Sequence, residues 1–219
     1  MSDEAPVSPG RLVLVPAVIT LAVTLLRLVG ELQGWSPRLF SREPGGGGAL
    51  VGISWLVPIF GAWFGWQIAK SGAATAKLAR ALGLTLLAFA VVPALGFAAR
   101  AAGLAEMSFG TFALYVLGAI VGLLLALRAW PALGRVLLAY AFAARIPVAL
   151  VMLVAILGNW GTHYDVPPSP DFPAMAPLTK WLLIGLLPQM TIWIWFTVVI
   201  GGLFGLGAAA LARRRRATA

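Results

Sequence analysis

The chain has 219 residues, of which 61% are hydrophobic and only 11% are charged, and its formal net charge is +9. Soluble globular domains are about 45–50% apolar and about 25% charged, so this composition excludes a soluble protein and indicates one whose solvent is lipid. The positive charge does not indicate a nucleic-acid partner, because the basic residues lie at the ends of apolar runs rather than together on one soluble face.

Six apolar runs are long enough to cross a hydrocarbon core of about 30 Å, which needs about 20 residues of α-helix. They cover residues 12–29, 49–69, 81–99, 109–127, 136–157 and 182–212. The runs are apolar on all sides, whereas barrel strands would alternate over segments of about ten residues. The sequence therefore predicts an all-α polytopic membrane bundle of six transmembrane helices. Because the connections are short, we expect residues 1–219 to form a single integral membrane domain with no soluble domain.

The two terminal runs need separate interpretation. The first run follows Arg11, as the apolar part of a signal peptide would, but it ends without an A-x-A-like cleavage site, so we expect an uncleaved span. Residues 1–10 are expected to form a short disordered lead. The last run is longer than one span requires, and we expect Pro188 to divide it into an interfacial part and a span proper.

Basic residues in the short loops predict the orientation of the helices. With both termini in the cytoplasm, ten Lys and Arg residues lie on the cytoplasmic side and four on the outer side, as the positive-inside rule requires. The cytoplasmic set is Arg11, Lys70, Lys77, Arg80, Arg128, Arg135, Arg213, Arg214, Arg215 and Arg216, and the outer set is Arg38, Arg42, Arg100 and Lys180. We therefore expect both termini to be cytoplasmic, in the plasma (inner) membrane of a bacterium.

Three predicted spans carry glycine pairs at the GxxxG spacing, which lets helix backbones approach closely in lipid. The pairs are Gly61 and Gly65, Gly118 and Gly122, and Gly201 and Gly205. They predict close packing either within the bundle or against another chain. In the second case the protein would be a homo-oligomer or a subunit of a larger membrane complex.

Prolines fall near the middle of three predicted spans, at Pro58, Pro93 and Pro147. Each removes one helical hydrogen bond and frees a carbonyl four residues earlier, so we expect several proline-kinked helices. The kinks are either passive or the sign of a cavity at the bilayer midplane.

Two predicted spans contain an arginine, and ionisable residues inside a membrane are functional-site hypotheses by default. Arg27 precedes Glu31 by four residues, so the two share a helix face and are expected to form an ion pair at the outer boundary.

Arg145 has no acidic residue inside its own or any other predicted span, so we expect it to face the bundle interior. Its partners would be freed carbonyls, polar or aromatic side chains, or an exogenous anion. The candidate side chains are Tyr140, Gln189, Thr191, Trp193 and Trp195.

The chain contains no cysteine and a single histidine, His163, which excludes thiolate catalysis, iron–sulfur clusters and the usual zinc sites. We expect neither a metal nor another cofactor. His163 and Asp165 in the loop before 182–212 are the polar candidates for acid–base work, although a rigid proline-rich cap over the bundle explains that loop equally well.

No known family is evident in this pattern, so function follows only from the residues. The leading hypothesis is a small permease or lipid-binding protein with a midplane cavity around Arg145 that accepts an anionic lipid or a small anionic substrate. The alternative is a structural or assembly subunit that docks through its GxxxG faces. An intramembrane enzyme is less well supported, because no nucleophile is paired with a base.

Overall fold

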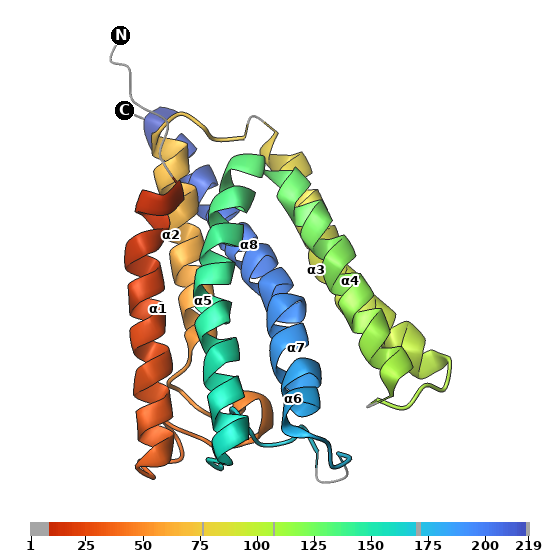
Figure 1. Ribbon diagram of the computed structural model, residues 1–219. Helices are drawn as coiled ribbons and strands as arrows, with labels where there is room; N and C mark the ends of the chain where they lie inside the picture. Colours follow the sequence, from red (N-terminus) through yellow and green to blue (C-terminus); the bar gives the residue numbers. More distant parts are fainter. Residues whose placement is uncertain (1–8, 76, 107, 170–171, 218–219) are drawn as a thin grey trace.

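The computed structural model describes residues 9–75, 77–106, 108–169 and 172–217. Of the expected lead, residues 1–8 lie outside this described part, and residues 9 and 10 already belong to helix α1 (Figure 1).

The described residues form helices joined by turns and loops and contain no strand. The longer helices are α1 (Pro9–Leu32), α2 (Leu56–Lys70), α3 (Leu78–Ala101), α4 (Phe109–Ala129), α5 (Pro131–Gly158) and α8 (Ile192–Ala217). The shorter elements are the 3₁₀ turns η1 (Pro44–Gly46) and η2 (Ile53–Trp55), the helices α6 (Pro177–Lys180) and α7 (Leu187–Met190), and the π-helix η3 (Trp181–Leu186) between them.

Five helical segments are long and apolar enough to cross a membrane. They are Gly10–Leu32, Leu78–Ala101, Phe109–Ala129, Pro131–Gly158 and Pro177–Arg215. This length and hydropathy confirm the expected multi-pass helical membrane protein, whose surroundings are a lipid bilayer.

Helix α2 is shorter than the apolar run that predicted it. The helix has 15 residues, because residues 49–55 form a loop and the turn η2 instead. Pro58 is thus the third residue of α2, in the first turn, where backbone N–H groups have no intrahelical partner to lose. The expected midplane kink at Pro58 is wrong, whereas Pro93 and Pro147 do lie inside α3 and α5, as Pro16 does inside α1.

The last apolar run is interrupted at Thr191 rather than at Pro188. Pro188 is the second residue of α7, and Thr191, with φ −121° and ψ −77°, separates α7 from α8. A proline ring crowds the carbonyl four residues earlier, here that of Ile184, which belongs to the π-helical stretch η3. The widened π-helical turn accommodates the proline ring, and the helix is interrupted three residues later, at Thr191.

Helix α8 organises the bundle, because it packs against α2, α3, α4 and α5, while α1 packs on α5. Figure 1 shows α3 and α4 running side by side as a hairpin, tilted away from α5 at the end where they are joined. Helix α1 begins and α8 ends at the same end of the bundle, and the loops after α1 and α5 lie at the opposite end.

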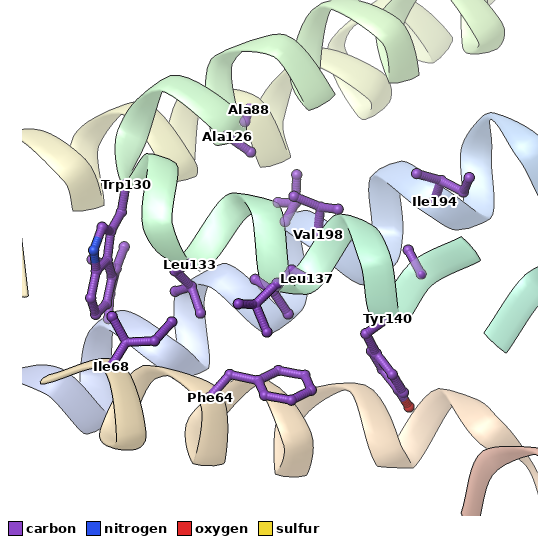
Figure 2. Close-up of a cluster of buried hydrophobic side chains, with 14 of the residues drawn as sticks. Phe64, Ile68, Ala88, Ala126, Trp130, Leu133, Leu137, Tyr140, Ile194 and Val198 are labelled. Atoms are coloured by element: carbon purple, nitrogen blue, oxygen red, sulfur yellow. The ribbon is translucent and has the colours of Figure 1, made fainter. Parts of the chain in front are cut away.

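The core between these helices is apolar. Figure 2 shows Phe64 of α2 beside Leu137 of α5, with Leu133 and Tyr140 of α5 and Val198 of α8 in the same cluster. All of these side chains are buried. The core thus holds α2, α5 and α8 together and leaves the large apolar side chains on the outside of the bundle to face lipid.

The GxxxG glycines make their close contacts inside the chain. A Cβ atom added to Gly61 would lie 2.4 Å from the Cα of Gly201, and one added to Gly65 would lie 2.2 Å from the carbonyl oxygen of Gly205. One added to Gly122 would lie 2.7 Å from the carbonyl oxygen of Ala88. These faces are occupied, and a partner chain could reach them only by displacing a helix of the bundle.

Candidate functional site

Helix α1 turns a polar stripe toward the bundle. Thr20, Thr24, Arg27 and Glu31 recur every three or four residues, which places them on one helix face, and all four are buried. The opposite face exposes large apolar side chains such as Leu14, Val15, Val18, Leu25 and Leu26. A helix with its polar side inward and its apolar side outward is the arrangement expected when the outside is lipid.

At the end of this stripe the carboxylate of Glu31 is the centre of a buried polar cluster. Arg27 Nε donates to Glu31 Oε1 at 2.8 Å, and the backbone N–H of His163 donates to Oε2 at 2.8 Å. His163 Nδ1 lies 2.5 Å from Oε1. Glu31 is 1% exposed, so charge-assisted hydrogen bonds take the place of the water it has lost.

The loop between α1 and α2 is held to the same cluster by hydrogen bonds that two arginines donate. Arg27 Nη2 donates to the carbonyl oxygens of Ser41 and Gly46, at 3.1 and 3.2 Å. Arg42 Nε donates to the carbonyl oxygen of Glu31 at 3.0 Å. Gly46 has φ +75°, and an added Cβ would lie 2.9 Å from Arg27 Nη2, so this position requires glycine.

The loop after α5 joins the same cluster through His163 and the residues beside it. Asp165 Oδ1 accepts from the backbone N–H of Thr162 at 2.7 Å, and its Oδ2 accepts from that of Gly161 at 2.9 Å. Tyr164 donates its hydroxyl to the carbonyl oxygen of Thr24 at 3.2 Å. Asp165 is therefore used to shape its own loop, while His163 pairs with Glu31, a partner 132 positions away in the sequence.

The pKa of His163, which lies in this loop, is lowered below its usual 6.5. Burial is the main cause, because it disfavours the charged imidazolium, and the positive charge of Arg27 acts in the same direction. The hydrogen bond to Glu31 and the charges of Glu31 and Asp165 oppose this shift without cancelling it.

We expect this shift to make the protein less stable as the pH falls from 7.5 to 5.5. In that range the unfolded chain takes up a proton on His163 before the folded chain does, so the free energy of unfolding decreases. Melting temperatures in detergent across the range measure the effect, and a His163→Gln variant should show a shallower pH slope. Equal slopes for the two proteins would contradict this assignment.

Arg145 lies midway along α5 and is 3% exposed. Its guanidinium carbon is 4.5 Å from the centroid of the Trp193 ring, a cation–π contact, and its Nε has no hydrogen-bond partner. The ion pairs among the described residues do not include Arg145. It is a buried cation without an acidic partner in the described part of the chain.

A cavity of about 180 Å³ connects Arg145 with the cluster around Glu31. Its wall comes from α1, α5, the turn η2, the loop after α5, and the segment from η3 to α8. The polar and aromatic residues of the wall are Thr24, Arg27, Ser54, Arg145, His163, Tyr164, Gln189 and Trp193. None of the described residues in this wall is acidic. Arg27 is paired with Glu31 behind the wall, so the charge that favours an anion in the cavity is that of Arg145.

The sequence-predicted partners of Arg145 divide into two groups. Gln189 and Trp193 line the cavity with it. Tyr140 instead shares a 2.8 Å hydrogen bond with Thr20 and packs on Phe60 and Phe64.

The other two candidates lie outside the cavity wall. Trp195 donates its Nε1–H to the carbonyl oxygen of Ala88 at 3.0 Å, which directs it toward α3 and α4. Thr191 donates its hydroxyl to the carbonyl oxygen of Leu187 within the same helical turn. Trp195 therefore joins α8 to α3, and Thr191 bonds the backbone of its own segment, so neither hydrogen bond involves Arg145.

Sequence reasoning missed several members of the site. The side chains of Thr24 and Ser54 were not singled out, although both line the cavity. A polar stripe of period three to four within an otherwise apolar helix would have identified Thr24, whereas the approach of η2 to α5 has no local signal. Among the described residues, no three histidine, aspartate or glutamate side chains gather where they could hold a metal ion.

Comparison of the chain with known proteins finds no matching family model, no matching curated relative and no matching solved structure.

Proposed function

We propose that the protein is a small membrane permease or lipid-binding protein that takes an anionic group into the cavity beside Arg145. The observation that carries this proposal is a buried guanidinium, facing a cavity, without an acidic partner among the described residues. An arginine at the centre of a membrane helix costs about 2.5–3.5 kcal/mol on insertion scales, so a side chain kept there has a role.

The size of the cavity restricts the ligand. About 180 Å³ is below the roughly 300–1,000 Å³ of sites for drug-sized molecules. The cavity suits a small carboxylate or phosphate ion, or the headgroup of a lipid whose acyl chains stay in the bilayer. The alternative function, a subunit that docks through its GxxxG faces, is less well supported because those faces are filled by the chain itself.

Two variants of Arg145 test the anion site. Arg145→Gln keeps hydrogen-bond donors but loses the charge, so we expect it to fold and to lose the bound anion. Arg145→Leu removes both and should bind no better. Bound lipid is measured by mass spectrometry of the purified protein, and small anions by the shift in melting temperature.

The control variant is Arg38→Gln, which changes an exposed arginine in the first loop and should leave binding unchanged. An Arg145→Gln protein with the same bound lipid and the same anion-induced shifts as wild type would contradict the proposal.

We further propose that α2 crosses the membrane with the five longer spans, so that six helices place both termini in the cytoplasm. The absence of cysteine from the sequence makes single-cysteine labelling direct. Pro168→Cys, in the loop after α5, should react with an impermeant thiol reagent on intact cells, and Ala73→Cys, between α2 and α3, should react only after lysis. The reverse pattern would overturn the proposed orientation.

A further inference from the structure

Two buried polar atoms, in side chains that line the cavity, have no hydrogen-bond partner. They are Arg145 Nε, a donor, and Gln189 Oε1, an acceptor. Both side chains are more than nine-tenths buried, with exposures of 3% and 7%. Buried polar atoms in native proteins are nearly always paired, so an unpaired donor and an unpaired acceptor in one wall indicate a partner that supplies both complements.

One end of the Gln189 amide already has a partner. Its Nε2 donates to Met152 Sδ at 3.7 Å, and a thioether sulfur can only accept, so the amide oxygen would gain no hydrogen bond in that place. The Oε1 atom is therefore the one left for a ligand. Gln189 and Trp193 lie on either side of the interruption at Thr191, and both line the cavity. The free acceptor and the ring that contacts the guanidinium of Arg145 therefore belong to one cavity wall.

Building on the proposed function, we propose that the ligand is a hydroxylated oxyanion. The anionic oxygens would accept from Arg145, and a hydroxyl beside them would donate to Gln189 Oε1. A plain carboxylate would pair Arg145 and leave the Gln189 oxygen unpaired in a water-poor site, which lowers affinity. Gln189 is then the residue that selects among anions, and Arg145 is the residue that attracts them.

The same chemistry is available from two sources, a small 2-hydroxycarboxylate or the headgroup of a hydroxylated anionic lipid. Each source has a matched pair of probes that differ in the hydroxyl. Lactate and propionate form the soluble pair, and phosphatidylglycerol and phosphatidylmethanol form the lipid pair. Binding of the full chain in detergent is measured by calorimetry for the first pair and by native mass spectrometry for the second.

We expect the hydroxylated member of one pair to bind at least about fivefold more tightly than its partner, and the pair that shows this identifies the source. Gln189→Met keeps the length of the side chain without its acceptor, so it should remove this preference while binding still depends on Arg145. Gln33→Met, at an exposed position after α1, is the control and should change neither property.

The outcomes separate the two proposals. Arg145-dependent binding without any preference for the hydroxyl in the wild-type protein would overturn this inference and leave the anion site standing. Absence of Arg145-dependent binding by all four probes would overturn both. Because the wild-type comparison is decisive alone, the result does not depend on the folding of the Gln189 variant.

Discussion

Replacing Glu31 with alanine is expected to destabilise the protein by about 3–5 kcal/mol, the range seen when one partner of a buried ion pair is removed. The carboxylate is 1% exposed and accepts hydrogen bonds from Arg27 and from the backbone of His163. Without it, Arg27 becomes a buried cation that lacks its acidic partner, and His163 in the loop after α5 loses its hydrogen bonds to α1. Equilibrium unfolding in mixed micelles measures the loss.

A double-mutant cycle with Arg27→Ala separates the ion pair from the other contacts of each residue. The double variant should lose less stability than the sum of the two single variants, because each single change leaves the other charge unpaired. Strict additivity would show that the two side chains do not interact.

The chain supplies its own control in Arg100 and Glu106, an ion pair whose side chains are both 75% exposed. Exposed pairs contribute about 0–1 kcal/mol, because water screens the charges and the side chains must be held in one geometry. Glu106→Ala should therefore have little effect. A loss similar to that of Glu31→Ala would mean that burial is not what makes the Glu31 pair important.

The Glu31 cluster shows which contacts a sequence can reveal. The pairing of Arg27 with Glu31 is local, since residues four apart on a helix are neighbours. The approach of His163 to the same carboxylate depends on how α1 and α5 pack and on how the following loop folds back. Neither the packing of these helices nor the fold of this loop can be read from the spacing of residues along the sequence. His163 was therefore grouped with Asp165, two residues away, instead of with Glu31.

Apolar run length predicted the helices well where the run was continuous and poorly at its edges. The run 49–69 was read as one helix, yet residues 49–55 form a loop and a 3₁₀ turn. Hydropathy measures transfer to lipid and does not distinguish a helix from an apolar loop folded against the bundle. The glycines at positions 45–48 and at Gly52 were the local signal that the helix begins later, and this shift is why Pro58 falls in its first turn.

Helical periodicity could have narrowed the set of partners proposed for Arg145. Tyr140 is five residues before Arg145, which is about 140° around an ideal helix, so the two side chains point in different directions. Trp193 and Trp195 are two residues apart and lie on nearly opposite faces, and only the former meets the guanidinium. The candidates were chosen for their polar or aromatic chemistry, and chemistry alone does not determine which way a side chain points.

Gly65→Ala is expected to destabilise the protein by about 3 kcal/mol, the upper part of the range for overpacking a close-packed contact. The added Cβ would lie 2.2 Å from the carbonyl oxygen of Gly205, where ordinary contact begins at 3.4 Å. The obstacle is backbone rather than a flexible side chain, so α2 and α8 must separate by about 1 Å and lose contact on both sides.

The matched control is Gly207→Ala in α8, at an exposed position where a Cβ would meet nothing within 4 Å. Alanine favours a helix over glycine by up to about 1 kcal/mol, so both variants gain this term and Gly207→Ala should be neutral or slightly stabilising. The difference between the two variants therefore isolates helix contact from helix propensity. If Gly65→Ala were as stable as Gly207→Ala, α2 and α8 would not be in close contact, and the glycine faces would be free to bind a second chain.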